Sequence, residues 1–331
     1  MKKIRMGVVG TNNITDWWLE GALEDSRFEL VAVCSRSIDK AKNFAGKYGA
    51  RLVFDKPEDM AACHDVDAVY IATPNSTHCE LSLLFMNHGK HVLCEKALAS
   101  NAAEVRLMIE ASRRNKVAFM EAMKTTVTPG FRKLIEKKAE LGVIRRYVAS
   151  YCQYSSRYDK LKEGVVLNAF RPELSNGALM DIGVYTIYPM VVLFGKPEDI
   201  AASALMLSTG VDGQGSGAFG YEGMNGNVIY SKIVDGTVPS EIQGESGTVV
   251  ISGINDCLDV AFKRRGESEW ETWGTADEKS SYYYEVAEFL DVIEAGRIES
   301  EINSHAASLA TMEVMDEMRR LTGVCFPADT E

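Results

Sequence analysis

The sequence predicts an α/β protein of two domains, in which a doubly wound parallel sheet is followed by an α+β domain with a mainly antiparallel sheet. The chain has 331 residues, which exceeds the usual size of a single hydrophobic core. Up to residue 122, short apolar segments alternate with helix-like segments, as expected for parallel strands joined by helical crossovers. The alternation then stops, so we place the domains at residues 1–122 and 123–331.

Composition and charge favour an enzyme that acts on small molecules. The net charge is −11, so the chain lacks the basic field that recruits nucleic acid or anionic lipid. No apolar run approaches the roughly 18 residues of a membrane-spanning helix, and polar residues interrupt the N-terminal apolar stretch before it could be a signal peptide. The seven cysteines form no Cys-x-x-Cys pair, which is typical of reduced thiols. We therefore expect a cytoplasmic protein without nucleic-acid or membrane partners.

The first predicted strand, residues 4–9, leads into a turn of small residues and then a helix. Backbone N–H groups and the helix dipole face an anion at such a junction. In the dinucleotide fingerprint Gly-x-Gly-x-x-Gly/Ala, Gly10 holds the first position, while Asn12 and Thr15 hold the second and third. Asn12 tolerates left-handed backbone angles, provided that its side chain points away from the pyrophosphate. An ordinary strand-to-helix turn is the alternative. The candidate cofactor-binding residues are Gly10, Thr11, Asn12, Asn13 and Ile14.

The end of the second strand, residues 28–34, indicates which cofactor is bound. NAD-dependent enzymes usually place an Asp or Glu here to hold the ribose 2′-hydroxyl, but this chain has Ser35 and Arg36. Hydroxyl and guanidinium groups suit a 2′-phosphate. We therefore expect NADP(H) to be preferred over NAD(H), with Lys40 as a possible helper. A solvated Arg36 at a helix start is the alternative.

The alternation continues through a helix at 39–48, a strand at 51–54, a helical turn from Pro57 and a strand at 68–72. The following turn lies at a strand's carboxyl end, where ligands of open α/β sheets bind. It adds the candidate cofactor-binding residues Ala72, Thr73, Pro74, Asn75 and His78. A helix at 79–88 follows. The remaining histidines and Cys94 lack the partners of a tetrahedral set, so no metal site is expected.

The segment 91–96 is an apolar strand that ends in Glu95 and Lys96, with a helix at 101–115 soon after it. Glu95 and Lys96 should therefore lie at the ligand crevice of the sheet. A surface ion pair that closes the strand is the alternative.

Several motifs in order resemble the glucose-fructose oxidoreductase, inositol dehydrogenase and MocA (Gfo/Idh/MocA) family. The matching segments are GVVGT at 7–11, ATPNSTH at 72–78, GKHVLCEK at 89–96, MEA at 120–122, GALMDIGVY at 177–185 and GVCFP at 323–327. The resemblance covers essentially the whole chain. It implies a Rossmann domain, then a domain whose open-faced sheet pairs subunits in a homodimer or a dimer of dimers.

The resemblance also implies a catalytic set of Lys96, Asp181 and Tyr185. In the family, the lysine lies beside the nicotinamide ribose and the reacting hydroxyl. Tyr185 stands where many members have a histidine. An ammonium group stabilises a phenolate, so Lys96 would assist Tyr185 as the general acid/base. Asp181, four residues earlier, would share its helix face and hold a substrate hydroxyl or orient Lys96.

The sequence departs from the family pattern in three ways. Ala97 replaces a proline, Asn12 and Thr15 replace small fingerprint residues, and Asn176 replaces a glycine. A cis bond before a non-proline residue costs about 2.5–4 kcal/mol. The Lys96–Ala97 bond is therefore expected to be trans, which could shift Lys96.

The second domain is expected to begin with an amphipathic helix at 130–141 that turns Phe131, Leu134 and Ile135 inward. A strand at 144–154 follows, and Tyr158 and Arg171 are weak candidates for substrate contacts, with a solvated loop as the alternative. Further strands are expected at 201–207, 228–234, 240–244, 248–252 and 259–264. The glycines at 210–226 suggest turns and bulges. Helices at 282–295 and 305–321 should pack back onto the first domain.

The sequence therefore predicts an NAD(P)-dependent oxidoreductase that transfers a hydride between nicotinamide and a carbinol carbon. The substrate class, a sugar, polyol or dihydrodiol, is implied only by the resemblance. A non-catalytic NAD(P)-binding regulator or scaffold and an NAD-recycling glycosidase of the same fold are the alternatives.

Overall fold

The computed structural model describes residues 3–275 and 279–330. It divides into two compact units, which are described separately. The first comprises Met1–Ala122 with Lys279–His305, and the second comprises Met123–Glu278 with Ala306–Glu331.

The first unit is built on a parallel sheet, which confirms the predicted fold class. Within the described residues its strands follow the order β3-β2-β1-β4-β5-β6, and all neighbouring pairs are parallel. The strands are β1 (Ile4–Val9), β2 (Phe28–Cys34), β3 (Leu52–Phe54), β4 (Ala68–Ile71), β5 (His91–Glu95) and β6 (Phe119–Ala122). The helices are α1 (Asn13–Ala22), α2 (Ile38–Tyr48), α3 (Pro57–Ala61), α4 (His78–Asn87), α5 (Ala102–Asn115) and α9 (Ser281–Glu294).

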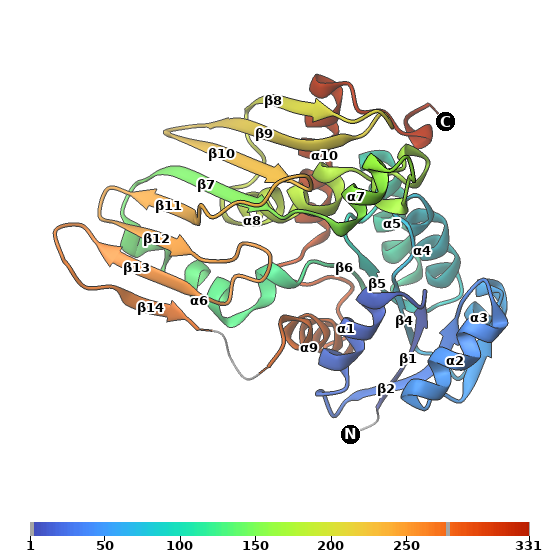
Figure 1. Cartoon of the computed structure of the whole chain (residues 1–331). Helices are drawn as coiled ribbons and strands as arrows, with labels where there is room; N and C mark the ends of the chain where they lie inside the picture. The colour runs from blue at the N-terminus through green and yellow to red at the C-terminus, as the bar shows by residue number, and fades with distance from the viewer. Residues whose placement is uncertain (1–2, 276–278, 331) are drawn as a thin grey trace. The chain divides into compact units, whose positions relative to one another are not determined.

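The sheet carries helices on both faces (Figure 1). Helices α1 and α9 share a buried core with alternate residues of the central strands, among them Met6, Tyr70 and Leu93. Gly21 lets these two helices approach closely, because a Cβ there would lie 2.6 Å from the Tyr283 backbone nitrogen. Burial of both faces explains why these strands read as continuous apolar runs.

The two C-terminal helices belong to different units. Helix α9 lies in the first unit, whereas α10 (His305–Thr322) belongs, after its first residue, to the second. The expectation that α10 packs onto the first domain stays a prediction. Its partner is α8 (Val184–Phe194), since the hydroxyls of Tyr188 and Ser308 lie 3.0 Å apart.

The second unit contains a mixed sheet in the order β14-β13-β12-β11-β7-β10-β9-β8. Within the described residues, β7 and β10 pair parallel and the other neighbours pair antiparallel. The strands are β7 (Ile144–Cys152), β8 (Asp199–Met206), β9 (Asp212–Tyr221), β10 (Met224–Ser231), β11 (Ser240–Gly244), β12 (Gly247–Ile251), β13 (Val260–Arg264) and β14 (Glu271–Gly274). The other helices of this unit are α6 (Pro129–Lys137) and α7 (Ser156–Lys162).

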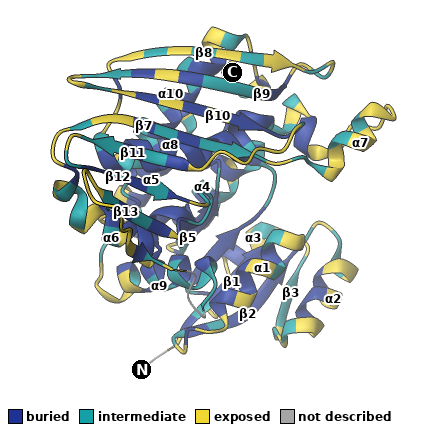
Figure 2. Ribbon diagram, turned by 60° about the vertical axis from the view of Figure 1, so that its left-hand side comes forward, coloured by how far each residue is buried: buried dark blue, intermediate teal, exposed yellow. Residues whose placement is uncertain are grey.

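One face of this sheet packs on helices and the other is open (Figure 2). Tyr147 of β7 is fully buried and donates a hydrogen bond to the Thr186 carbonyl of α8 at 2.9 Å. On β10, Val228 and Tyr230 are buried, whereas Asn227 and Ile229 between them are exposed. This alternation is the pattern of an antiparallel-type sheet with one covered face.

Three details of the second unit differ from expectation. Ile135 is 38% exposed, so it does not face inward with Phe131 and Leu134. Strand β14 was not predicted. Most of the clustered glycines lie inside β9 and β10. Large side chains pack closely against these strands, and a Cβ on Gly215 would lie 2.4 Å from the Tyr230 hydroxyl.

The apolar segment Pro172–Phe194 has the length and composition of a membrane-spanning helix, so the expectation that no apolar run approaches this length needs correction. However, 83% of its most apolar stretch is buried in the fold. It is a core element of the second unit and gives only weak evidence for a membrane span.

Candidate active site

In the first unit, the candidate cofactor site begins at the turn from β1 into α1. Gly10 has φ +107°, and a Cβ there would lie 2.3 Å from the Ala72 carbonyl oxygen. Asn12 caps α1, since its Oδ1 accepts hydrogen bonds from the backbone N–H groups of Ile14 (3.1 Å) and Thr15 (3.4 Å). Its Nδ2 donates to the Ala72 carbonyl at 3.0 Å. The Asn12 side chain is therefore held against α1 and β4, as a cradle for a pyrophosphate requires.

Asn12 reaches this arrangement without left-handed backbone angles. Its φ is −106° and its ψ is 178°, which is extended backbone. The tolerance of asparagine for left-handed angles is thus not what preserves the turn. The side-chain cap does so, because it satisfies N–H groups that a helix start leaves unpaired.

The end of β2 lies beside this turn. The Thr11 hydroxyl donates to the Ser35 hydroxyl at 3.4 Å. Arg36 is exposed, and Ser37 caps α2 by accepting from the Lys40 backbone N–H at 3.4 Å. Lys40 is also exposed. The structure thus brings two hydroxyls and an unburied guanidinium to the edge where a ribose 2′-substituent is expected.

The turn after β4 is braced by a buried histidine. The two ring nitrogens of His78 lie 3.0 Å from the Ala97 carbonyl oxygen and 2.9 Å from the Thr73 carbonyl oxygen. Burial lowers the pKa of His78 to about 4, so the ring is neutral at neutral pH. His78 is fully buried. It therefore positions Thr73 and Ala97, and the turn residues Pro74 and Asn75 remain the candidates for direct cofactor contact.

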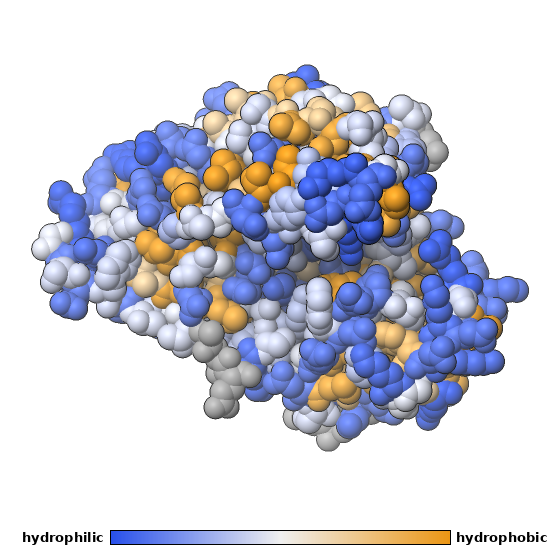
Figure 3. All heavy atoms as spheres, in the orientation of Figure 1, coloured by the Kyte–Doolittle hydropathy of each residue, from blue (hydrophilic) through white to orange (hydrophobic). Residues whose placement is uncertain are grey.

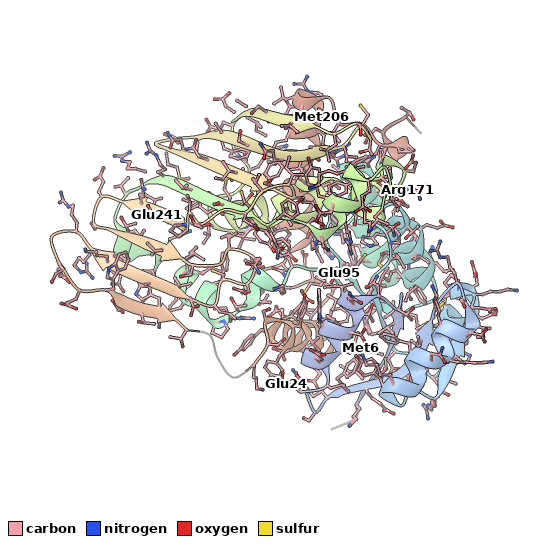
Figure 4. All side chains as sticks on the ribbon, viewed as in Figure 1. Met6, Glu24, Glu95, Arg171, Met206 and Glu241 are labelled. Atoms are coloured by element: carbon pink, nitrogen blue, oxygen red, sulfur yellow. The ribbon has the colours of Figure 1, made fainter. Side chains whose placement is uncertain are left out.

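The carboxylate of Glu95, at the end of β5, is buried (Figure 4). It accepts a hydrogen bond from the Tyr70 hydroxyl and another from the Lys96 backbone N–H at 3.3 Å. Tyr70 in turn stacks on Trp18 with 4.0 Å between ring centroids. A surface ion pair does not describe this arrangement. Glu95 holds the backbone of Lys96, which is itself only partly buried.

The Lys96–Ala97 peptide bond is cis, so the expectation of a trans bond is wrong. That expectation considered the dipeptide alone. In the folded unit Ala97 is fully buried and its carbonyl oxygen contacts His78. These surroundings are formed by residues distant in sequence.

In the second unit, the candidate residues are Asp181 and Tyr185. Asp181 sits in a π-helical turn, Leu179–Gly183, and not in the α-helix that the four-residue spacing assumed. Such turns are frequent at functional sites. Asp181 forms an ion pair with Lys232, which follows β10. Tyr185 begins α8, is 8% exposed, and packs edge-on against the Tyr151 ring with centroids 5.6 Å apart.

Asp212 anchors the chain that carries both residues. Its carboxylate accepts hydrogen bonds from the backbone N–H groups of Ala178 (3.0 Å) and Leu179 (2.8 Å). Burial raises the pKa of Asp212 to about 6, although these hydrogen bonds and the charge of Lys232 act in the opposite direction. Sequence reasoning missed both Asp212 and Lys232. Lys232 carries the signal that had identified Lys96, a charge at the end of an apolar strand.

The two weak substrate candidates have different surroundings. Tyr158 is partly buried and its ring lies 6.1 Å from that of Phe170. Arg171 is exposed and pairs with Glu173 at 3.5 Å (Figure 4). The structure therefore agrees with the alternative of a solvated loop for Arg171.

A cavity of about 300 Å³ lies at the carboxyl end of β7. Tyr151, which touches Tyr185, forms part of its wall. No Lys, Arg, Asp or Glu occurs in its lining, which consists of Ser150, Tyr151, Cys152, Gln153, Gly236, Thr237, Val238, Ser252, Gly253, Ile254 and Asn255. Across residues 3–275 and 279–330, no group of three or more His, Cys, Asp or Glu side chains is placed to hold a metal ion.

Comparison with known proteins extends over both units. Residues 4–123 match the oxidoreductase family with an NAD-binding Rossmann fold, and residues 131–250 match the GFO/IDH/MocA C-terminal domain. The chain is 49% identical to scyllo-inositol 2-dehydrogenase (NADP(+)) IolU of Bacillus subtilis (strain 168), with 98% of this chain and 99% of the relative covered. It is 31% identical to trans-1,2-dihydrobenzene-1,2-diol dehydrogenase of Danio rerio, with 93% of each covered. Among solved structures, aldose-aldose oxidoreductase from Caulobacter crescentus superposes with a TM-score of 0.86 at 20% identity, covering 97% of this chain and 98% of the other.

Proposed function

The chain belongs to the GFO/IDH/MocA family of oxidoreductases, and from this premise we propose that it is an NADP-dependent dehydrogenase of a neutral cyclic polyol. The family and its relatives make it an NAD(P)-dependent enzyme acting on CH–OH groups. A non-catalytic scaffold is therefore set aside.

The first unit fits a dinucleotide. Gly10 lets the turn lie against the Ala72 backbone, where a Cβ would clash with the carbonyl oxygen, and the Asn12 side chain is held by α1 and the Ala72 carbonyl. The Thr11 and Ser35 hydroxyls and the exposed Arg36 would hold a 2′-phosphate by charge-assisted hydrogen bonds. The two residues directly after β2, Ser35 and Arg36, include no carboxylate that would repel that phosphate. The relative IolU is named for NADP(+). These observations support NADP(H) over NAD(H).

Tyr185 would take or return the proton of the reacting hydroxyl. The bound cofactor supplies the nicotinamide carbon that exchanges hydride with the carbinol carbon. Lys96, held by Glu95 through its backbone, would stabilise the phenolate form of Tyr185. Asp181 would accept a hydrogen bond from a second hydroxyl and thereby orient the ring. The resemblance that identified these residues supports their roles.

The cavity that Tyr151 lines carries the substrate proposal, and the Tyr151 ring packs against that of Tyr185. Its lining offers hydroxyl, amide and backbone groups but no ionic side chain, so a neutral polyhydroxylated ring would find hydrogen bonds without an unpaired buried charge. A phosphorylated or carboxylated substrate would lack a counter-charge in this lining. The name of IolU supports an inositol.

The test is a panel of substrates with NADP+ and NAD+. Scyllo-inositol, myo-inositol, D-glucose and trans-dihydrobenzenediol would be compared with inositol phosphate. We expect NADPH formation with a neutral inositol and at least about tenfold lower kcat/KM with the phosphate, which corresponds to about 1.4 kcal/mol. Preferred oxidation of the phosphate would contradict the proposal, as would activity with NAD+ equal to that with NADP+.

We further propose that the enzyme is a homo-oligomer through the open face of the second sheet. Exposed apolar residues on this unit include Leu205, Met206 and Ile229, and hydrophobic side chains gather over the region of β8–β10 (Figure 3). Large exposed apolar patches often mark interfaces. Sedimentation velocity of wild type and of an Ile229→Lys variant tests this. A monomeric wild type would contradict it.

A further inference from the structure

Lys232 is a buried cation that the proposed mechanism does not use. The residue is 3% exposed, and its ammonium pairs with Asp181. The same ammonium lies over the Phe170 ring, 5.5 Å from the centroid. A buried charge is strongly unfavourable unless it is paired. The side chain is therefore fixed between the carboxylate of the proposed substrate-orienting residue and an aromatic ring.

The backbone of Lys232 is fixed as well. Its N–H donates to the Gly213 carbonyl at 2.9 Å, and its carbonyl accepts from the Ser155 N–H at 2.9 Å. Ser155 caps α7, and Tyr158 of that helix contacts Phe170. Lys232 thus connects β9, the segment 155–170 and Asp181 within the second unit. A rigid strand end is a more accurate platform for a site than a free loop.

The Asp181 carboxylate is held from two sides. Asp212 binds the backbone of Ala178 and Leu179 just before it, and Lys232 binds the carboxylate itself. Without Lys232, the carboxylate would lose the ammonium that pairs with it. The oxygen that meets a substrate hydroxyl would then no longer be in a defined place. Misplacement by about 1 Å can lower a rate by about 100-fold.

We propose that Lys232 is a positioning residue of the enzyme, which fixes the Asp181 carboxylate and couples it to the segment 155–170. This rests on the proposed function, since it concerns how Asp181 orients the polyol. It assigns no proton transfer to Lys232. Substrate discrimination therefore depends on Lys232 even though cofactor binding does not.

The test compares Lys232→Met and Lys232→Arg with wild type. We expect Lys232→Met to lower kcat/KM for the polyol by about 100-fold and to leave KM for NADP+ within about twofold. Lys232→Arg should retain kcat/KM within about tenfold, since a guanidinium can still pair with the carboxylate. The control is Lys196→Met, which removes an exposed ion pair with Glu313 in the same unit and should leave both parameters unchanged.

The Asp181→Asn variant and the double variant of Asp181→Asn with Lys232→Met complete a double-mutant cycle. If Lys232 acts through Asp181, Lys232→Met should lower kcat/KM much less in the Asp181→Asn background than in wild type. If the losses of kcat/KM in the two single variants multiply in the double variant, the inference is overturned. A wild-type kcat/KM in Lys232→Met would also overturn it. Equal increases in the KM for NADP+ and in the KM for the polyol would indicate general damage to the fold and would also overturn the inference. An inactive wild type would instead overturn the proposed function, and this inference with it.

Discussion

Replacement of Arg36 by alanine should weaken NADPH binding and leave NADH binding almost unchanged. Arg36 is exposed at the end of β2, next to the Ser35 hydroxyl that contacts Thr11. A hydrogen bond to a charged group contributes about 1.5–3 kcal/mol. Because solvent screens an exposed site, we take the lower part of that range. At about 1.4 kcal/mol per tenfold change, the dissociation constant for NADPH should rise about 10–30-fold.

The assay is fluorescence titration of the purified enzyme with NADPH and with NADH. The Arg36→Ala variant should change the NADH dissociation constant less than about threefold, because NADH lacks the 2′-phosphate. Raising the ionic strength should weaken NADPH binding more in wild type than in the variant. The control is Lys42→Ala, which removes an exposed cation on α2 and should match wild type. Equal losses for both cofactors, or none for NADPH, would refute a role of Arg36 in recognising the phosphate.

Three further predictions concern the supporting structure. Gly10→Ala should weaken binding of both cofactors at least about tenfold, because the residue has φ +107° and its Cβ would meet the Ala72 carbonyl. The control is Gly46→Ala in α2, where a Cβ would point into open space, and this variant should bind both cofactors normally. His78 has a pKa of about 4 in the fold against about 6.5 unfolded, so the unfolded chain binds the proton more readily between these values. Stability from neutral His78 is present above about pH 6.5 and is lost as pH falls toward about 4, which amounts to ~2 kcal/mol between about pH 7 and about pH 5. The free energy of unfolding, measured in urea at several pH values, should fall with pH more steeply in wild type than in the His78→Asn variant. The same pH dependence in both proteins would contradict the prediction. Phe289→Ala should lower the free energy of unfolding by about 3–5 kcal/mol, because the ring is fully buried in the core between α9 and the sheet, and a loss under about 1 kcal/mol would show that α9 is not part of that core.

Local patterns were sufficient for the first sheet and for the elements of the cofactor half. Alternating apolar runs and helical segments defined the parallel strands, because both faces of each strand are buried. Gly10, Ser35, Arg36 and Lys96 could be selected because each follows directly after a strand, where chain order alone places it at the ligand edge of the sheet. Some element ends differed by a residue: Asn101, for example, was counted into its helix but is the N-cap of α5.

Features that depend on distant residues could not be predicted. The pair of Asp181 and Lys232 joins positions 51 residues apart, and no spacing rule connects a helical turn to the end of a later strand. His78 was chosen for its place in a motif, but its burial between two carbonyls depends on a contact with Ala97, which is distant in sequence. The same contact lies beside the cis bond between Lys96 and Ala97. Division of the last two helices between the units depends on surfaces that amphipathic pattern alone does not distinguish.

The most direct test of hydride transfer with Tyr185 as the acid/base uses a polyol deuterated at its carbinol carbons. The oxidised cofactor and labelled scyllo-inositol are incubated with wild type, Tyr185→Phe and Lys96→Met, and the reduced cofactor is examined by mass spectrometry and proton NMR. We predict deuterium at the nicotinamide C4 position with wild type. Tyr185→Phe should form this product at least about 100-fold more slowly while binding NADPH normally. Reduced cofactor without deuterium, or an undiminished rate in Tyr185→Phe, would contradict the account.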